Sequence, residues 1–311
     1  MNLLFVLVML LPSDIFLLIP IAGFAFFGLT GAIQQNGNPA IILVPGAFHQ
    51  ASIYDKVISI LHEDGYSDTT AVNLPSVGSV VGREPDIEAV RSLLLQKLTQ
   101  GIDVLLVGNS YGATVIGEAV KDLKEYQAPE QYSVLSNNLD RFSGHGYRSN
   151  NRGQILGLVF FAGYIPKITD VTQPETKLDI HLVSPSFFRF SDDGKVFWDN
   201  DLEQYPPAVT FYNDLSSSEQ KEWSQKLNFS SFDALNAYPT YIPYTGDFKC
   251  TYVIGEKDFS VPPSLAESLI GQEGAIFTVQ RLADADHVPM LSRPDEVVEE
   301  IQRAIGYTKK E

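Results

Sequence analysis

The sequence has a single cysteine, Cys250, among its 311 residues. One thiol can form neither an internal disulfide framework nor a cysteine-based metal cluster, so both are excluded. Cys250 stands at the start of an apolar, β-rich run, and we interpret it as a core side chain. Internal repeats, Gly-rich phosphate loops and zinc-ligand spacings are also absent from the sequence. We therefore expect no metal and no cofactor.

Basic residues are scarce, because 22 Lys and Arg stand against 38 Asp and Glu, which gives a net charge of −16. A surface that acidic repels phosphate backbones, so nucleic acid is not an expected partner. The partner that we expect is a small-molecule substrate. The sequence gives no indication of the oligomeric state.

Charge is almost missing from the N-terminal segment, residues 1–33, where Asp14 is the only charged side chain. Its second apolar stretch, residues 15–33, would be roughly 28 Å long as a helix, just enough to span a bilayer. Three interpretations compete: an uncleaved membrane anchor, a cleaved signal peptide with a small-residue site at 30–32, or an extension packed on the fold. We favour a protein anchored in a secretory-pathway membrane, or secreted if the segment is cleaved. The Asn228 sequon is a glycosylation site only in that setting.

From residue 39 onward, short apolar runs of β-forming residues alternate with amphipathic stretches. Strands that are apolar on both faces and alternate with helices indicate a mainly parallel sheet of about six strands with helices on both faces. The fold class is therefore α/β. We expect strands at residues 40–44, 69–74, 103–107, 154–161, 250–255 and 276–281, and helices at 52–63, 86–99, 111–125, 263–269 and 294–305.

Two stretches interrupt this alternation. Residues 127–152 are polar and predict a long surface loop. Residues 164–248 hold both tryptophans and many other aromatic side chains, and we expect an inserted helical cap there. The pair Ser216 and Glu219 has capping-box spacing and predicts a helix start in the cap. The expected organisation is a hydrophobic segment at 1–33, a core formed by 34–163 and 249–311, and a cap at 164–248.

Ser110 is the candidate nucleophile, within Gly108-Asn109-Ser110-Tyr111-Gly112. The G-x-S-x-G pattern alone is weak evidence, because short motifs also occur by chance. Here it follows a buried strand and precedes a helix, the strand–turn–helix elbow that exposes a nucleophilic serine. The same turn places the Tyr111 amide and the positive end of the helix dipole near a developing oxyanion. This context disfavours the alternative of a Gly-rich turn with a capping serine.

A nucleophilic serine needs a base, and five histidines are present. His287 lies in the loop between the last expected strand and the last helix, at the sheet edge onto which the elbow opens. His62 is expected on a helix, His145 in the polar loop and His181 in the cap. His49 follows the end of the first strand and is a candidate substrate contact. We predict that His287 is the general base.

The acid that orients the base is expected in the loop after the strand at 250–255. Asp258 lies three residues beyond that strand and can reach toward His287. Glu256 is the weaker alternative, and Asp286, adjacent to the base, is expected to point away. Asp258 would fix the imidazole tautomer and stabilise its cation.

The second oxyanion donor is expected in residues 44–49, directly after the first strand. Gly46 permits close approach of the backbone. The Ala47 amide is the first candidate and the Phe48 amide the second. The Phe48 and His49 side chains are also candidate substrate contacts.

These motifs resemble the α/β-hydrolase superfamily, and within it the branch of plant methylesterases and hydroxynitrile lyases with their fungal relatives. The residues that carry the resemblance are 44–49, the elbow at 108–112, the Asp258 loop and Asp-His-Val-Pro-Met-Leu-Ser at 286–292. The resemblance covers about residues 40–306, with the cap matching only loosely. It implies the α/β-hydrolase fold and a triad of serine, aspartate and histidine.

Some positions depart from the family pattern. Pro45 and Asn109 stand where the family usually has histidine, and neither position supplies triad chemistry. The lyases of the branch carry threonine at the position of Gly46 and lysine at that of Val288. Because Val288 offers no cation to stabilise cyanide, the resemblance favours ester hydrolysis.

We expect a serine carboxylesterase that cleaves a bulky, apolar small-molecule ester through an acyl-enzyme. The aromatic cap motivates the apolar substrate, because its rings can bury a hydrophobic group. Two alternatives stay open. One is a non-hydrolytic or carbon–carbon-cleaving enzyme on the same fold, and the other is a ligand receptor without turnover.

Overall fold

The computed structural model describes residues 38–128 and 152–306, and its central feature is a parallel sheet. Its strands are β1 (Ala40–Val44), β2 (Thr69–Ala71), β3 (Val104–Asn109), β4 (Ile155–Phe161), β8 (Cys250–Gly255) and β9 (Thr278–Leu282). Their order is β2-β1-β3-β4-β8-β9, and every neighbouring pair is parallel. This sheet confirms the expected fold class.

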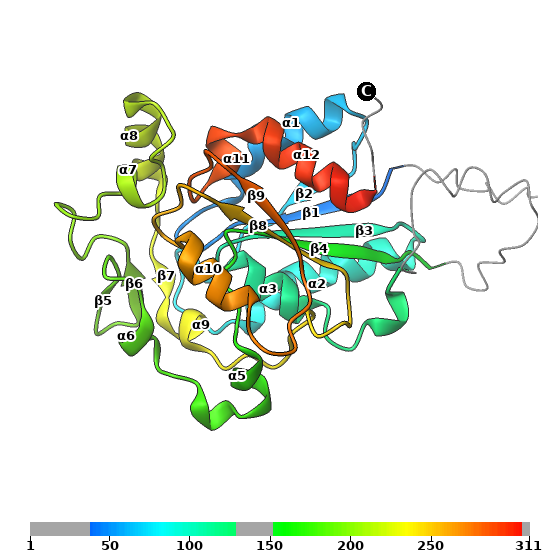
Figure 1. Cartoon of the computed structure of the whole chain (residues 1–311), viewed down its shortest axis with the longest axis horizontal. Coiled ribbons are helices and arrows are strands. Elements are labelled where there is room, and N and C mark those ends of the chain that lie inside the picture. Colours follow the sequence, from blue (N-terminus) through cyan, green and yellow to red (C-terminus); the bar gives the residue numbers. More distant parts are fainter. Residues whose placement is uncertain (1–37, 129–151, 307–311) are drawn as a thin grey trace, which may run out of the picture. The chain divides into compact units, whose positions relative to one another are not determined.

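Helices cover both faces of the sheet, with two short 3-10 turns between them. They are η1 (Ala51–Tyr54), α1 (Asp55–Glu63), α2 (Glu84–Thr99), α3 (Gly112–Ala119), η2 (Lys124–Tyr126), α10 (Pro263–Ile270), α11 (Pro289–Ser292) and α12 (Pro294–Ile305). Helices α1 and α12 pack together on one face, and α2 and α3 pack together on the other (Figure 1). Strands β1, β3 and β4 are buried along their whole length, as strands covered on both faces must be. In α12, Val297, Ile301 and Ile305 form the buried face.

The strand order places the candidate site at one edge of the sheet. Strand β1 has β2 on one side and β3 on the other, so the connections run in opposite directions from it. In open parallel sheets, ligands bind at such a switch point, outside the carboxyl ends of the strands. The loops after β1, β3, β8 and β9 carry Ala47, Ser110, Asp258 and His287, in that order. All four therefore leave the sheet at the same edge.

The insertion between β4 and β8 consists of short elements. They are α5 (Ile168–Thr172), η3 (Pro174–Thr176), α6 (Ile180–Val183), β5 (Arg189–Phe190), β6 (Lys195–Phe197), α7 (Pro207–Thr210), α8 (Ser217–Lys226), β7 (Ser230–Ser231) and α9 (Phe232–Asn236). Figure 1 shows that β5–β7, α7 and α8 lie beyond the carboxyl ends of the central strands. The expected capping box is present at the start of α8, where the Ser216 hydroxyl and Glu219 carboxylate cap each other's backbone amides.

The insertion also contains a feature that the sequence did not predict. Strands β5, β6 and β7 form a small antiparallel sheet. Strands of two or three residues are too short to show an alternating pattern, so only the helices were expected. The cap boundaries at 164 and 248 stay a prediction.

Several expectations concern residues outside the described ranges. The N-terminal segment 1–33, His145 and most of the loop at 127–152 belong to this group, so anchoring or secretion stays a prediction. Within residues 38–128 and 152–306, no helix is both long enough and apolar enough to cross a membrane. Cys250 is buried, which confirms its interpretation as a core side chain.

Candidate active site

Ser110 lies at a sharp turn between β3 and α3, with a left-handed backbone at φ 51°. That conformation is strained for a residue with a side chain, and such strain is concentrated at functional sites. Two backbone hydrogen bonds hold the turn. The Ser110 amide donates to Phe161 O at 3.1 Å, and the Tyr164 amide donates to Ser110 O at 3.0 Å. Ser110 thus occupies the elbow position expected from the sequence.

The glycines around Ser110 are required by close backbone contacts. A Cβ on Gly108 would lie 2.6 Å from Gly112 O, and a Cβ on Gly112 would lie 2.5 Å from Pro45 O. A Cβ on Gly46 would lie 2.8 Å from the Ser110 Cβ. The loop after β1 is therefore pressed against the elbow, and these positions have no room for a side chain.

His287 and Asp258 form a buried pair, in which His287 Nδ1–H donates to Asp258 Oδ2 at 2.9 Å. The two side chains are 3% and 0% exposed. The other carboxylate oxygen, Oδ1, accepts from the amides of Ser260 and Val261 at 2.7 and 2.8 Å, which fixes its orientation. A proton on Nδ1 leaves the Nε2 lone pair available, as a general base requires.

The two other acids that the sequence places near His287 have partners elsewhere. Glu256 Oε1 accepts from an arginine of β9 at 2.7 Å on the surface. Asp286 accepts from the Val288 amide at 3.2 Å and from the Ser292 hydroxyl at 2.8 Å. Burial raises the pKa of Asp286 to about 6. Since Nδ1 of His287 donates to Asp258, neither of these carboxylates occupies that atom.

Asn109, which directly precedes Ser110, links the elbow to the loop that carries His287. Its Nδ2 donates to Phe161 O at 3.1 Å and to His287 O at 3.0 Å. The side chain is fully buried. Asparagine therefore supplies at this position a structural bridge between two loops of the site.

A cavity of about 830 Å³ opens over the elbow. Its wall includes Ser110, His287, Ala47, Phe48 and Tyr111, so the structure brings the candidate nucleophile, base and oxyanion residues to one space. In the described part of the chain, the Ser110 hydroxyl has no hydrogen-bond partner. Proton transfer requires it to approach His287 Nε2 to about 2.6–3.2 Å. The described residues contain no group of three or more His, Cys, Asp or Glu that could hold a metal ion.

The backbone amides around the candidate oxyanion position differ in availability. The Phe48 amide donates to the Ser230 hydroxyl at 2.9 Å. The amides of Ala47 and Tyr111 have no acceptor among the described residues. Unpaired N–H groups beside a reactive centre can stabilise an oxyanion. The geometry therefore favours Ala47 over Phe48 as the partner of Tyr111.

We expected the His49 side chain to contact substrate, but it does not line the cavity. Its Nδ1–H donates to Ala47 O at 2.8 Å, and its Nε2 accepts from the Tyr212 hydroxyl at 2.8 Å. Phe48 has φ 69°, and this turn of the backbone separates the two side chains, so that Phe48 faces the cavity while His49 is buried behind the loop. Burial lowers the pKa of His49 to about 4, which keeps the ring neutral.

Four consecutive residues of the insertion, 211–214, contact the loops that carry the site, and we call them the coupling segment. The Phe211 ring lines the cavity, with its centre 5.7 Å from that of the His287 ring and 5.3 Å from that of the His49 ring. Tyr212 holds His49 through the hydrogen bond described above. The first half of the segment thus contacts both the candidate base and the candidate oxyanion loop.

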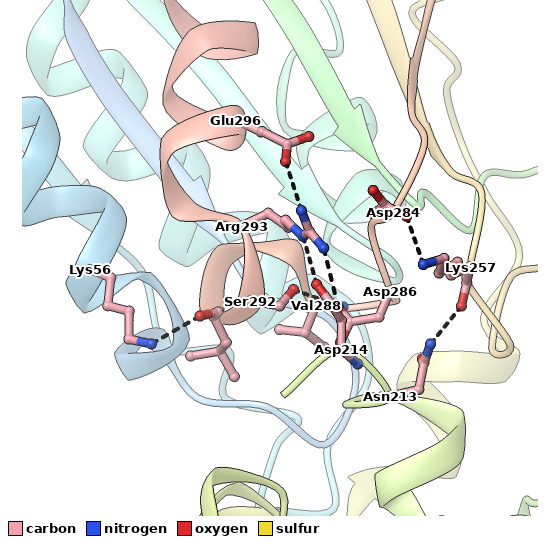
Figure 2. A network of polar contacts seen from close by, with 11 residues as sticks. Lys56, Asn213, Asp214, Lys257, Asp284, Asp286, Val288, Ser292, Arg293 and Glu296 are labelled. Atoms are coloured by element: carbon pink, nitrogen blue, oxygen red, sulfur yellow. Dashed lines mark hydrogen bonds and ion pairs between the residues drawn. The ribbon is translucent and has the colours of Figure 1, made fainter. Parts of the chain in front are cut away.

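The second half of the coupling segment binds the acid loop and the base loop (Figure 2). Asn213 Nδ2 donates to the carbonyl of Lys257 at 3.1 Å, directly before the candidate acid. The Asp214 amide donates to Asp286 Oδ2 at 3.2 Å, and its carboxylate accepts from Arg293 Nε and Nη2 at 2.6 and 3.2 Å. No sequence signal identifies these residues, because their partners lie 44 to 79 positions away.

A buried polar network lies beside the elbow. Arg83 Nη1 donates to Glu118 Oε1 at 2.8 Å, and the two side chains are 6% and 2% exposed. Asp86 accepts from the hydroxyls of Ser76 and Tyr111 at 2.5 and 2.8 Å. Tyr111 is therefore held through its side chain while its amide stays at the cavity. The sequence did not predict this network.

Comparisons with known proteins agree with this architecture. The sequence model described as "Alpha/beta hydrolase family" matches residues 41–300. "Alpha/beta hydrolase nvfD" of Aspergillus novofumigatus (strain IBT 16806) is 28% identical over 282 residues, which cover 86% of this chain and 97% of that protein. Among solved structures, polyneuridine aldehyde esterase has a TM-score of 0.60 at 18% identity and covers 86% of this chain and 99% of its own.

A methylesterase, MES16 from Arabidopsis, has a TM-score of 0.58 at 15% identity, covering 87% of this chain and 100% of its own. At such identities the structural matches show the fold. The chain belongs to the alpha/beta hydrolase family.

Proposed function

We propose that this protein is a serine hydrolase that cleaves a carboxylic ester of a bulky, apolar small molecule through an acyl-enzyme. One observation carries the proposal: Ser110 and His287 share one cavity wall, and His287 is hydrogen-bonded to the buried Asp258. Family membership supports a hydrolase. The two esterases among the structural matches favour ester chemistry.

The proposed reaction has two halves. His287 Nε2 takes the proton of Ser110 while Oγ attacks the ester carbonyl, and the amides of Ala47 and Tyr111 donate to the oxyanion. The C–O bond to the alcohol breaks as His287 gives the proton to the leaving oxygen. Water then attacks the acyl carbon and loses a proton to His287, which returns it to Ser110 as the carboxylic acid leaves. Asp258 stays ionised and stabilises the imidazolium.

The cavity wall supports an apolar substrate. It includes Phe48, Phe187, Phe188 and Phe211, whose rings contact one another in edge-to-face and tilted pairs. A volume of about 830 Å³ lies within the range of pockets that bury most of a drug-sized ligand. A bulky hydrocarbon part can therefore be buried while the ester group reaches Ser110.

Labelling with a fluorophosphonate probe tests the nucleophile. We expect the wild type to be labelled at Ser110 and to hydrolyse p-nitrophenyl esters of graded chain length, and Ser110→Ala to do neither. Ser186→Ala, which changes another serine of the cavity wall, is the matched control and should behave as the wild type.

Equal labelling of wild type and Ser110→Ala would place the nucleophile elsewhere. Tight binding of apolar esters by a wild type that is neither labelled nor active would indicate a receptor. Product analysis by mass spectrometry separates hydrolysis from carbon–carbon cleavage, since only hydrolysis gives the free acid and the intact alcohol.

A further inference from the structure

A cation on the cavity wall, Lys177, has no carboxylate partner among the described residues. Its Nζ donates to Leu178 O and Asn236 Oδ1, each at 3.2 Å, and lies 5.1 Å from the centre of the Tyr238 ring. An ammonium group has three N–H donors, so one stays available to a ligand. The side chain is half-buried, and Asn236 holds its end in place.

The other charged side chains of the wall differ from Lys177. Arg83 binds the Glu118 carboxylate and three backbone carbonyls, so four of its five N–H donors are occupied and its charge is paired. Lys167 is exposed, and water and salt screen its charge. Asp170 is the acid of this wall, and its carboxylate accepts from the Lys167 amide. Lys177 is thus the partly desolvated cation of the wall that an incoming group can reach.

The surroundings of Lys177 favour an anion. Burial and, to a smaller extent, the charge of Arg83 lower the pKa of Lys177, while the charges of Asp170 and Asp179 act in the opposite direction. A bound anion would offset both effects that disfavour the ammonium ion. Because the chain carries a net charge of −16, an anionic ligand also needs a local cation to enter the cavity.

Exposed apolar side chains line the same cavity as this cation. Leu178, Val183 and Phe259 line the cavity and are exposed. An amphiphilic molecule would meet an apolar wall along its body and one ammonium group. A purely hydrocarbon ester would leave that ammonium group facing it without a partner, which is unfavourable.

We propose that Lys177 binds a carboxylate of the substrate, so that the substrate class is an apolar ester carrying an acid group away from the scissile bond. This assignment rests on the proposed ester hydrolysis and names the substrate class of the same site. A charge-assisted hydrogen bond at a half-buried position favours the acid-bearing ester over its neutral counterpart by about tenfold.

Paired esters test the assignment. On the acyl side, mono-p-nitrophenyl suberate is compared with p-nitrophenyl octanoate, and on the alcohol side 4-acetoxybenzoate is compared with phenyl acetate. In at least one pair, the ratio of kcat/KM for the acid to that for the neutral ester should fall about tenfold in Lys177→Met. Lys177→Arg should keep most of the ratio, and Asp170→Asn should raise it. Lys226→Met, which removes an exposed lysine of α8, is the matched control and should leave the ratio unchanged.

Each outcome is decisive. Equal ratios in wild type and Lys177→Met for both pairs would overturn the assignment and leave ester hydrolysis standing. An equal loss of activity on the acid and neutral esters would give Lys177 a structural role and would also overturn it. Failure of the wild type to hydrolyse any of the four esters would overturn the proposed function and this inference with it.

Discussion

Replacing His49 by asparagine is expected to remove much of the loss of stability that the protein shows in mild acid. Burial lowers the pKa of His49 to about 4, whereas a histidine in an unfolded chain has a pKa of about 6.5. Between these values the unfolded chain binds a proton that the folded chain excludes. The contribution to the free energy of unfolding is therefore complete above about pH 6.5 and is lost as the pH falls toward 4. It amounts to about 3 kcal/mol, of which about 2 kcal/mol is lost between pH 8 and pH 5.

Urea unfolding followed by tryptophan fluorescence at pH 8 and pH 5 measures the effect. The amide of His49→Asn can still donate to Ala47 O but cannot titrate, so the wild type should lose about 2 kcal/mol more than the variant. Asp286 acts with the opposite sign, because its pKa, raised to about 6, lets the folded chain bind the proton first and gain stability as the pH falls. That contribution is common to both proteins and cancels. The same pH dependence in both proteins would refute the reasoning.

Three further substitutions test the site and its support. Asp258→Asn is expected to lower kcat on p-nitrophenyl esters by about 10⁴-fold, because asparagine favours the wrong imidazole tautomer. The control Glu256→Gln should keep a kcat near that of the wild type. An active Asp258→Asn variant would assign the acid to another residue. Gly46→Ala places a Cβ 2.8 Å from the Ser110 Cβ, so the oxyanion loop and the elbow must move apart. This variant should no longer be labelled by the fluorophosphonate probe, and an unchanged labelling rate would contradict the close contact. Glu118→Gln leaves the buried Arg83 guanidinium without its carboxylate partner. The free energy of unfolding, measured in urea, should therefore fall by about 3 kcal/mol. A fall of less than about 1 kcal/mol would argue against a buried ion pair.

The sheet and the positions of the elbow and of the candidate acid and base were predictable because chain order encodes them. Parallel strands end at one edge, so loops that follow them meet there whatever the intervening sequence. Ser110 needs glycine neighbours for its turn, and those glycines are visible in the sequence. Asp258 and His287 follow the last two strands and therefore lie beside each other.

The contacts of the insertion were not predictable for the opposite reason. Asp214 meets partners 72 and 79 positions away, and only the fold of a long irregular segment brings them together. The direction of His49 depended on a single backbone angle at Phe48, which a residue type does not reveal. The absence of a carboxylate partner for Lys177 in the described part of the chain depends on the folded surroundings of this side chain, so the sequence did not predict it.

The coupling segment has a consequence for how this protein can change. Residues 211–214 contact the oxyanion, acid and base loops, whereas Lys177, Phe187 and Phe188 shape the cavity from earlier parts of the insertion. Most residues of the insertion that shape the cavity are thus distinct from those that hold the site loops, although Phe211 does both and Ser230 also binds the Phe48 amide. Mutations elsewhere in the insertion can remodel the pocket while these contacts are kept, so a new substrate can be acquired without rebuilding the chemistry. A library aimed at altered specificity should vary the insertion and hold residues 211–214 and Ser230 constant.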